Sequence, residues 1–231
     1  MNKQIDKIRN TNFDTFIIFD ACRYDYFEKL YEDYFDGDLE KVWSPASCTP
    51  RWIEKAFPDK YDFTYVSGNP GLSSAGKDVS WCRYDASKHF KKVIDVWDYG
   101  WDETLATTPP NEVTLAAMFE GKKIVHYIQP HFPFIGEHKI LRGGNKVNNR
   151  RHGGKGAVGR IIEESGYEYV KIAYEENVKL VMEYTTELID FLDNEKIIIT
   201  ADHGEFLDRP ERHPCGRNDK ILREVPWLSI T

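Results

Sequence analysis

Three short apolar runs, each followed by polar side chains, constrain the fold of this chain more than any other feature. They are residues 15–19 (TFIIF), 123–128 (KIVHYI) and 196–200 (KIIIT). A continuous apolar run of this length is typical of a strand buried on both faces of a parallel sheet. Helix-compatible stretches lie between the runs, at residues 23–34, 111–119 and 167–192. The alternation predicts an α/β fold: a doubly wound, mostly parallel sheet with helices on both faces.

Weaker strand patterns occur at residues 61–66, 92–96 and 225–230. A chain of 231 residues with 41% hydrophobic and 30% charged residues has the size and composition of one globular domain. We therefore expect a single domain over residues 1–231. Residues 137–160 interrupt the pattern, because they are rich in Gly, Asn, Arg and Lys and lack apolar periodicity. We expect a flexible basic insertion there, a mobile flap beside the site that an anionic substrate orders.

Charge and cysteine usage limit the possible partners and the compartment. The net charge is −7, which disfavours nonspecific nucleic-acid binding. No apolar run reaches the ~18 residues of a transmembrane helix, and the polar N-terminus does not resemble a signal peptide. The four cysteines (Cys22, Cys48, Cys82 and Cys215) do not form a disulfide scaffold in a chain of this length, so we expect reduced thiols. These features together predict a cytoplasmic protein.

Polar residues that can bind a metal follow the three strongest strands. Asp20 follows the first run, His131 follows the second, and Asp202 and His203 follow the third, with Glu205 two residues later. In open α/β sheets, ligands bind beyond the carboxyl ends of the strands. Mixed carboxylate and imidazole ligands suit Zn²⁺ or Mn²⁺, with Ca²⁺ or Mg²⁺ as less favoured alternatives. The pattern predicts a divalent metal site at this edge of the sheet.

Several segments, in order along the chain, resemble the alkaline phosphatase and sulfatase superfamily. FIIFDACRYD (16–25) resembles its first strand, SPASCTPRW (44–52) lies where the family has its nucleophile, and HYIQPHFPF (126–134) is similar to a substrate-binding segment. IIITADHGEFL (197–207) resembles the metal-binding strand and loop, and HPCG and REVPWL resemble the end of the domain. The resemblance spans residues 16–230 and implies the same fold.

The resemblance also implies roles for individual residues. Asp20, Asp202 and His203 match metal ligands, and one residue among Ser47, Cys48 and Thr49 matches a nucleophile that also contacts the metal. His131 and His213 match histidines that bind the substrate or, in two-metal members, a second ion. His213 or His131 would protonate the leaving group. Arg23 and Arg51 are cationic neighbours for an anionic oxygen.

Two departures from the sulfatase pattern favour Thr49 as the nucleophile, with Cys48 second and Ser47 third. Sulfatases carry Cys-x-Pro-x-Arg, but here Arg51 directly follows Pro50, and Asp20 is followed by Ala21 rather than a second aspartate. Thr49 also precedes Pro50 at the start of a helix-compatible stretch, where threonine is a favourable N-cap and free N–H groups attract anions.

We therefore expect a metal-dependent hydrolase or transferase of phosphate or sulfate esters, acting on a small-molecule, glycan-linked or lipid-linked anionic ester. A non-catalytic domain that binds an anion or a partner on the same fold is the main alternative. Nucleic-acid binding through the basic insertion is a weaker one, because no aromatic residues are interleaved with the basic ones.

Overall fold

The computed structural model describes residues 2–74, 82–141, 154–192, 196–209 and 211–231, and its centre is an eight-stranded sheet. The strand order is β1-β3-β8-β7-β2-β6-β4-β5. The strands are β1 (Asn2–Lys3), β2 (Thr15–Asp20), β3 (Asp38–Trp43), β4 (Tyr61–Ser67), β5 (Phe90–Asp95), β6 (Lys123–Pro130), β7 (Ile197–Ala201) and β8 (Glu224–Ile230).

The direction of the strands confirms the predicted fold class. β7, β2, β6, β4 and β5 are paired in parallel, and β1 is parallel to β3. Among the described strands only β8 runs in the opposite direction, between β3 and β7. β2 lies in the middle of the parallel part, with β7 on one side and β6 on the other. The polar residues that follow these three strands therefore share one edge of the sheet.

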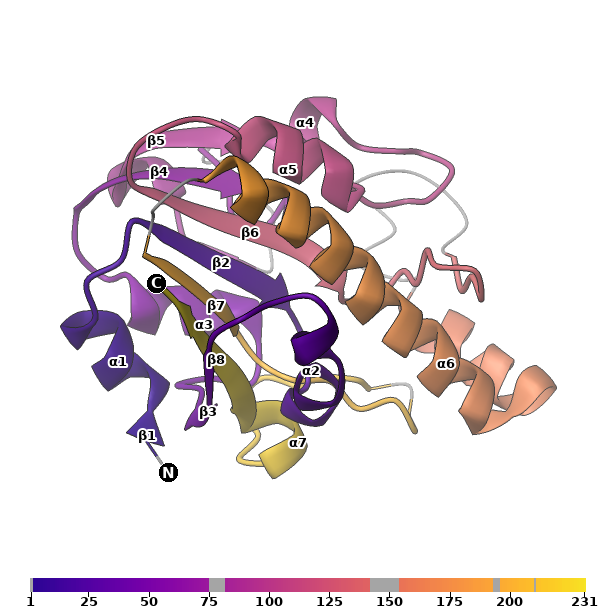
Figure 1. Cartoon of the computed structure of the whole chain (residues 1–231). Helices are drawn as coiled ribbons and strands as arrows, with labels where there is room; N and C mark the ends of the chain where they lie inside the picture. Colours follow the sequence, from indigo (N-terminus) through magenta and orange to yellow (C-terminus); the bar gives the residue numbers. More distant parts are fainter. Residues whose placement is uncertain (1, 75–81, 142–153, 193–195, 210) are drawn as a thin grey trace.

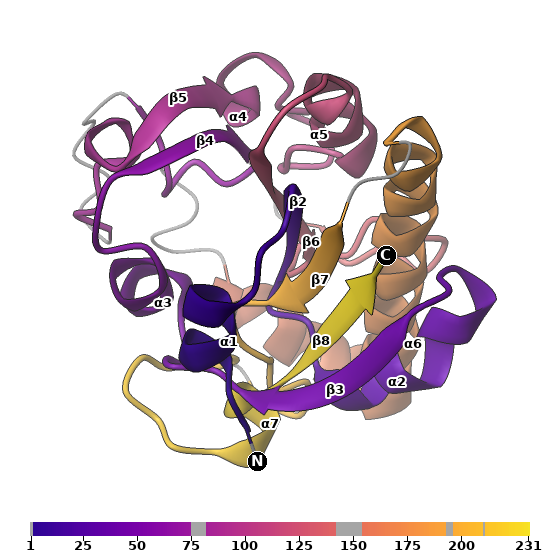
Figure 2. The ribbon, with the colours of Figure 1, turned by 60° about the vertical axis from the view of Figure 1, so that its left-hand side comes forward.

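Helices cover both faces of the sheet (Figures 1 and 2). The α-helices are α1 (Gln4–Asn10), α2 (Tyr24–Leu30), α3 (Thr49–Ala56), α4 (Val96–Tyr99), α5 (Pro110–Ala117), α6 (Gly154–Phe191) and α7 (Lys220–Arg223), and η1 (Tyr31–Asp33) and η2 (Ala86–Lys88) are short 3₁₀ turns. Figure 2 shows α2, α5 and α6 on one face of the sheet and α1 and α3 on the other. α6 packs against β6 and α5, and α1 contacts α3.

The central strands are buried along their whole length, which accounts for their apolar sequences. Every residue of β2, β6 and β7 is buried. Aromatic side chains fill the space beneath α3, where Phe16 contacts Phe57 and Trp227. Burying side chains of this size stabilises the fold by about 1.5–3 kcal/mol each. Within the described residues, no helix combines the length and apolarity needed to cross a membrane.

The structure contains elements that the sequence pattern did not indicate. They are the helices α1, α4 and α7 and the strands β1 and β3, whose side chains are mostly exposed or half-buried. The expected insertion at residues 137–160 is partly helical, because α6 begins at Gly154, and a break at Gly166 (φ 80°) separates this first part from the rest of the helix. Residues 142–153 of that segment lie outside the described residues, so the predicted flap remains a prediction.

Candidate metal centre and nucleophile

Four side chains that the sequence singled out meet at the carboxyl edge of the sheet. Asp20 ends β2, Asp202 and His203 follow β7, and Thr49 begins α3. The Thr49 hydroxyl oxygen lies 3.5 Å from Asp20 Oδ1 and 3.3 Å from His203 Nε2. His203 Nε2 is 3.4 Å from Asp202 Oδ2 and 3.8 Å from Asp20 Oδ1. All four residues are buried. We call this group the first cluster.

The hydrogen bonding of His203 fixes which ring nitrogen faces this cluster. Its Nδ1 lies 2.8 Å from the carbonyl oxygen of Gly204, and because a carbonyl only accepts, Nδ1 carries the proton. The lone pair of a neutral ring is then on Nε2, the atom that faces Thr49 and the two carboxylates. Metal-binding histidines are commonly oriented by such a bond at the other ring nitrogen.

Backbone and amide groups hold the two carboxylates in place. Asp202 Oδ1 accepts hydrogen bonds from the N–H groups of Ala21 and His203. Ala21 has the left-handed conformation (φ 63°), which is costly for a residue with a side chain and is often found at functional sites. Its carbonyl accepts a hydrogen bond from the hydroxyl of Tyr174 on α6. Asn69, which follows β4, donates to Asp20 Oδ2 at 2.7 Å.

The first cluster fits a divalent cation on the evidence of its donor atoms. Asp202 is fully buried, and its Oδ2 atom has no hydrogen-bond partner among the described residues. A carboxylate oxygen of Asp20 lies within 4.8 Å of one of Asp202 and of a ring nitrogen of His126. Two buried carboxylates this close repel each other unless a cation or a proton lies between them. Two carboxylates, an imidazole and a hydroxyl form a ligand set for such a cation.

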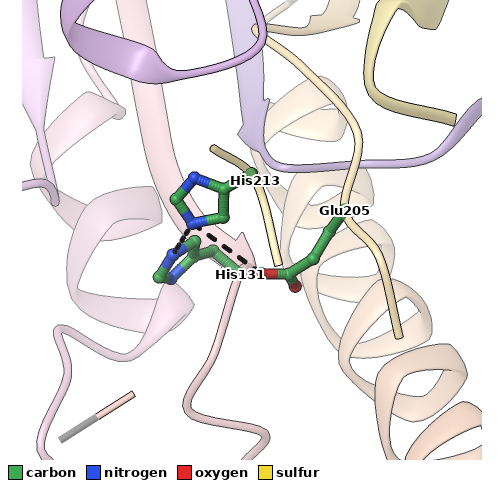
Figure 3. A group of neighbouring side chains, drawn as sticks. All are labelled: His131, Glu205 and His213. Atoms are coloured by element: carbon green, nitrogen blue, oxygen red, sulfur yellow. Dashed lines mark hydrogen bonds and ion pairs between the residues drawn. The ribbon is translucent and has the colours of Figure 1, made fainter. Parts of the chain in front are cut away.

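A second group of possible ligands lies beside the first (Figure 3). His131 follows β6, Glu205 follows β7, and His213 comes from the loop before α7. His131 Nε2 and His213 Nε2 are 3.0 Å apart, and His213 Nε2 lies 3.9 Å from Glu205 Oε1. The side chains of Figure 3 point toward one another, with one ligand atom from each within 4.8 Å of the others. We call this group the second cluster.

The two clusters adjoin each other. The imidazole rings of His203 and His213 are 4.7 Å apart between centroids, and the backbone N–H of His131 donates to the carbonyl of Asp20. Glu205 is also ion-paired with buried Arg212, whose Nη1 lies 2.9 Å from Glu205 Oε1. The two clusters therefore lie side by side at the carboxyl edge of the sheet.

The start of α3 differs from the predicted capping arrangement. Cys48, not Thr49, is the N-cap residue of α3, and its side chain makes no capping hydrogen bond. Thr49 is the first helical residue, followed by Pro50. The Thr49 hydroxyl is consequently directed to Asp20 and His203 instead of the helix backbone. The prediction of Thr49 as an N-cap was wrong, but its position at the start of a helix was correct.

A disulfide bond contradicts the expectation of reduced thiols. Cys48 is bonded to Cys215 across a sequence separation of 167 residues. The Cys48 sulfur is therefore not a free thiol, which removes the second-ranked candidate nucleophile. The third, Ser47, uses its hydroxyl to donate to the Pro214 carbonyl at 2.9 Å. Cys22 is free and buried, and burial raises the pKa of its thiol well above the usual value, so it stays protonated and is a poor metal ligand.

We expect the Cys48–Cys215 disulfide to stabilise the fold substantially. Replacing both residues with serine should lower the free energy of unfolding by roughly 2–5 kcal/mol, because the bond closes a long loop and restricts the unfolded chain. Urea denaturation of the oxidised parent and of the double variant, followed by circular dichroism, measures the difference. A loss below about 0.5 kcal/mol, the usual effect of a neutral surface substitution, would contradict this expectation.

The two arginines expected to bind the substrate occupy different surroundings. Arg23 forms hydrogen bonds with both carboxylate oxygens of Asp25, and its guanidinium lies 5.1 Å from the ring centroid of Tyr26. The guanidinium is thus already paired with a carboxylate. Arg51 is exposed on α3, and a side chain at Gly216 would approach its Nη1 to 3.0 Å. Arg51 thus lies beside the loop that carries His213.

Three residues of the site were not assigned a role from the sequence: Asn69, Glu205 and Arg212. Glu205 was named among the polar residues that follow β7 but was given no specific role, and its place two residues after His203 was the available signal. A side chain at Gly204 would collide with the Ile221 carbonyl oxygen at 1.9 Å, so only glycine allows this close approach to the backbone of Ile221. Asn69 and Arg212 carry no comparable pattern in the sequence.

Comparison with family models finds no match to the sequence, and no curated protein matches it. Solved structures do match. The soluble domain of lipooligosaccharide phosphoethanolamine transferase A from Neisseria meningitidis aligns with a TM-score of 0.60 at 13% identity, over 93% of this chain and 75% of that chain. The C-terminal periplasmic domain of phosphoethanolamine transferase EptC from Campylobacter jejuni aligns with a TM-score of 0.53 at 12% identity, over 94% and 78%. Phosphonate monoester hydrolase of Agrobacterium radiobacter gives 0.53 at 12%, over 93% and 67%.

The expected cytoplasmic location is contradicted. The matched Campylobacter structure is a periplasmic domain, and the Cys48–Cys215 disulfide is a feature of proteins in oxidising compartments. The prediction relied on the polar N-terminus and on the assumption of reduced cysteines, and the structure removes the second of these.

The fold is therefore supported by two independent observations. The order of motifs along the sequence predicted it, and the matched transferase and hydrolase structures share it over more than nine-tenths of this chain. The chain has the fold of the alkaline phosphatase and sulfatase superfamily.

Proposed function

We propose that this protein is a metal-dependent phosphoester transferase or hydrolase in which Thr49 is the nucleophile. The observation that carries the proposal is the position of the Thr49 hydroxyl, 3.5 Å from Asp20 Oδ1 and 3.3 Å from His203 Nε2 at the start of α3. A hydroxyl is a weak nucleophile until a metal or base activates it, and the buried first cluster offers the ligands for such a metal. The fold shared with phosphoethanolamine transferases and a phosphonate hydrolase supports the same chemistry.

The first turn of α3 would bind the substrate anion. The first intrahelical hydrogen bond of α3 runs from Trp52 N to Cys48 O, which leaves the N–H groups of Thr49 and Arg51 available to the ester oxygens. The positive end of the helix dipole adds to this attraction. Thr49 would then attack phosphorus, forming an O–P bond as the ester oxygen leaves.

Asp20, Asp202, His203 and Thr49 would hold a divalent ion, which would supply the positive charge that lowers the pKa of the Thr49 hydroxyl and offsets the charge of the ester. Carboxylate and imidazole ligands favour Zn²⁺ or Mn²⁺ over Ca²⁺ or Mg²⁺. The second cluster would either bind a second ion or hold the substrate directly. In the latter case His213 or His131 donates a proton to the leaving oxygen. Water or an acceptor alcohol then removes the group from Thr49, the two outcomes being hydrolysis and transfer.

Phosphate esters fit the site better than sulfate esters. Sulfatases use a cysteine that is converted to formylglycine, and the resemblance places that residue at Cys48. Here the sulfur of Cys48 is bonded to Cys215, which blocks the conversion. The substrate class extends to small-molecule, glycan-linked and lipid-linked anionic esters.

We expect a substrate panel to show turnover of phosphate monoesters or diesters and not of sulfate esters. The oxidised protein is assayed with nitrophenyl phosphate, bis(nitrophenyl) phosphate, nitrophenyl phenylphosphonate and nitrophenyl sulfate, each with Zn²⁺, Mn²⁺, Mg²⁺ or Ca²⁺. An acceptor alcohol such as ethanolamine or glycerol is included to detect transfer. Protein that binds metal and inorganic phosphate but turns over none of the esters would instead be a non-catalytic anion-binding domain. Preference for the sulfate ester would restore the sulfatase interpretation.

A further inference from the structure

A disulfide bond joins the start of α3, which carries the proposed nucleophile Thr49, to the loop that carries His213. Cys48 directly precedes Thr49, and Cys215 follows His213 by two residues. Their Cα atoms are 5.2 Å apart. Thr49 belongs to the first cluster and His213 to the second, so the disulfide connects the backbone segments of both clusters within three residues of each functional side chain.

Hydrogen bonds strengthen the same connection. Ser47 Oγ donates to the Pro214 carbonyl at 2.9 Å and accepts from the Arg217 N–H at 3.2 Å. The loop turns at Gly216 (φ 84°), where Arg51 of α3 lies against it. The Cys48 disulfide and the Ser47 hydrogen bonds thus fasten the loop to the start of α3.

The two sides of His213 are held differently: Arg212 before it is buried, ion-paired with Glu205 and bonded through its carbonyl to the Phe206 N–H, whereas the segment after it is exposed. Residues 215–218 are exposed and belong to neither a helix nor a strand. His213 itself is only partly buried, with 27% of its side chain exposed. His131, His203 and Glu205, which lie beside its ring, belong to the two clusters. Exposed loops with few packed contacts move readily, so on its C-terminal side His213 is held through the attachment of residues 214–217 to α3, which complements the Arg212 anchor on its N-terminal side.

We propose that the Cys48–Cys215 disulfide is a positioning element. It holds His213 of the second cluster at a fixed position relative to Thr49 of the first. Cleaving the bond frees the loop, loosens the second cluster and leaves the first cluster assembled by β2, β7 and α3. The part of this inference that concerns turnover rests on the proposed function. The parts that concern loop motion and metal affinity do not.

A reductant can reach the disulfide in the folded protein through Cys215, which is exposed, although Cys48 is buried. A dithiol such as dithiothreitol supplies two electrons and two protons, and the S–S bond is replaced by two thiols while the dithiol becomes a cyclic disulfide. Reduction of the folded protein therefore tests the proposal alongside substitution.

The experiment compares the oxidised parent, the dithiothreitol-treated parent, the Cys48→Ser/Cys215→Ser double variant and Ser47→Ala. Cys82→Ser, which removes a buried free thiol, is the matched control. Hydrogen exchange of metal-free protein is followed in peptides covering residues 211–219, with residues 197–201 of β7 as internal reference. Zinc affinity is measured by competition with a chromophoric chelator, and Glu205→Gln identifies the ion of the second cluster. Circular dichroism verifies that each sample is folded.

We expect faster exchange at residues 211–219 with β7 unchanged, and a loss of about 10- to 100-fold in zinc affinity at the second cluster, the usual effect of removing support from a metal ligand. kcat should fall more than KM rises. Ser47→Ala should act in the same direction but more weakly, dithiothreitol should add nothing to the double variant, and Cys82→Ser should respond to it as the parent does. If the double variant does not fold, the reduced parent and Ser47→Ala carry the test.

Unchanged exchange and unchanged zinc affinity in the folded, reduced parent would overturn the proposal and leave the disulfide a stabilising cross-link only. If no protein, the parent included, turns over any ester while exchange and zinc affinity respond as expected, the proposed function fails and the positioning role stands.

Discussion

Replacing Thr49 with alanine is expected to lower the rate of ester turnover by roughly four to six orders of magnitude, the range seen when a catalytic nucleophile is removed. The change deletes the one hydroxyl that lies between Asp20 and His203 in the first cluster. The loss should appear in kcat, because the substrate contacts of the α3 backbone and of the second cluster remain. Single-turnover and steady-state assays with the ester identified by the panel measure it.

Thr49→Ser is the matched control, because it keeps the hydroxyl and removes only a methyl group. We expect it to retain most of the activity that Thr49→Ala loses, and its bound phosphoryl group should be detectable at residue 49 by mass spectrometry. Cys48→Ala should cost much less than Thr49→Ala, since it acts through the lost disulfide. Thr49→Ala protein that turns over the ester at the parent rate would remove Thr49 from the mechanism.

The strands that the sequence predicted are those whose burial leaves a continuous apolar pattern. β2 and β7 are covered on both faces, so every position must be apolar or internally satisfied. β3 could not be predicted in the same way, because its residues Asp38, Glu40 and Lys41 face the surface or lie half-buried near the sheet edge. Its pairing with β8 is a tertiary feature that local sequence does not record.

The candidate site was predictable to the extent that topology dictates it. Asp20 ends β2 and Asp202 directly follows β7, so placing these parallel strands side by side is enough to bring the two carboxylates together. Asn69 was not predictable, because an asparagine before a proline in a glycine-containing segment is the ordinary composition of a turn. The Cys48–Cys215 bond was not predictable either, since spacing along the chain does not reveal which cysteines pair.

Removing the metal is expected to abolish turnover and to lower thermal stability. A chelator such as dipicolinate should reduce the rate by at least about a thousandfold, because the ion supplies several kcal/mol of transition-state stabilisation and each 1.36 kcal/mol is a factor of ten. Zinc present at a thousand times its Kd stabilises the folded chain by about 4 kcal/mol. For a chain of this size that corresponds to a rise in Tm of about 10 °C. Differential scanning calorimetry of chelated and zinc-loaded protein measures the shift.

The Asp202→Asn variant separates the effect of the metal on thermal stability from the effect of the buried carboxylate itself. In the parent without metal, the buried Asp202 carboxylate has an oxygen with no hydrogen-bond partner among the described residues, and Asp20 lies beside it. Burial of such a charge without a cation is destabilising. The neutral amide removes this repulsion while keeping the shape of the side chain. We therefore expect the metal-free variant to be at least as stable as the metal-free parent.

With zinc bound, the parent should be more stable than the Asp202→Asn variant, because the variant has lost a charged ligand and gains little stability from the ion. The parent's Tm should rise with zinc, the variant's should stay nearly constant, and the variant's turnover should remain at the chelated level. Asp208→Asn is the matched control: it changes an exposed carboxylate on the same loop, one that pairs with Arg209, and should respond to zinc as the parent does.

An Asp202→Asn protein that binds zinc with parental affinity and shows the same rise in Tm would exclude Asp202 as a ligand. The ion would then lie elsewhere, and the second cluster is the remaining set of ligands among the described residues. That crossover between metal-free and zinc-loaded stability follows only if the buried carboxylates need a cation, which makes it a test of the first cluster that requires no substrate.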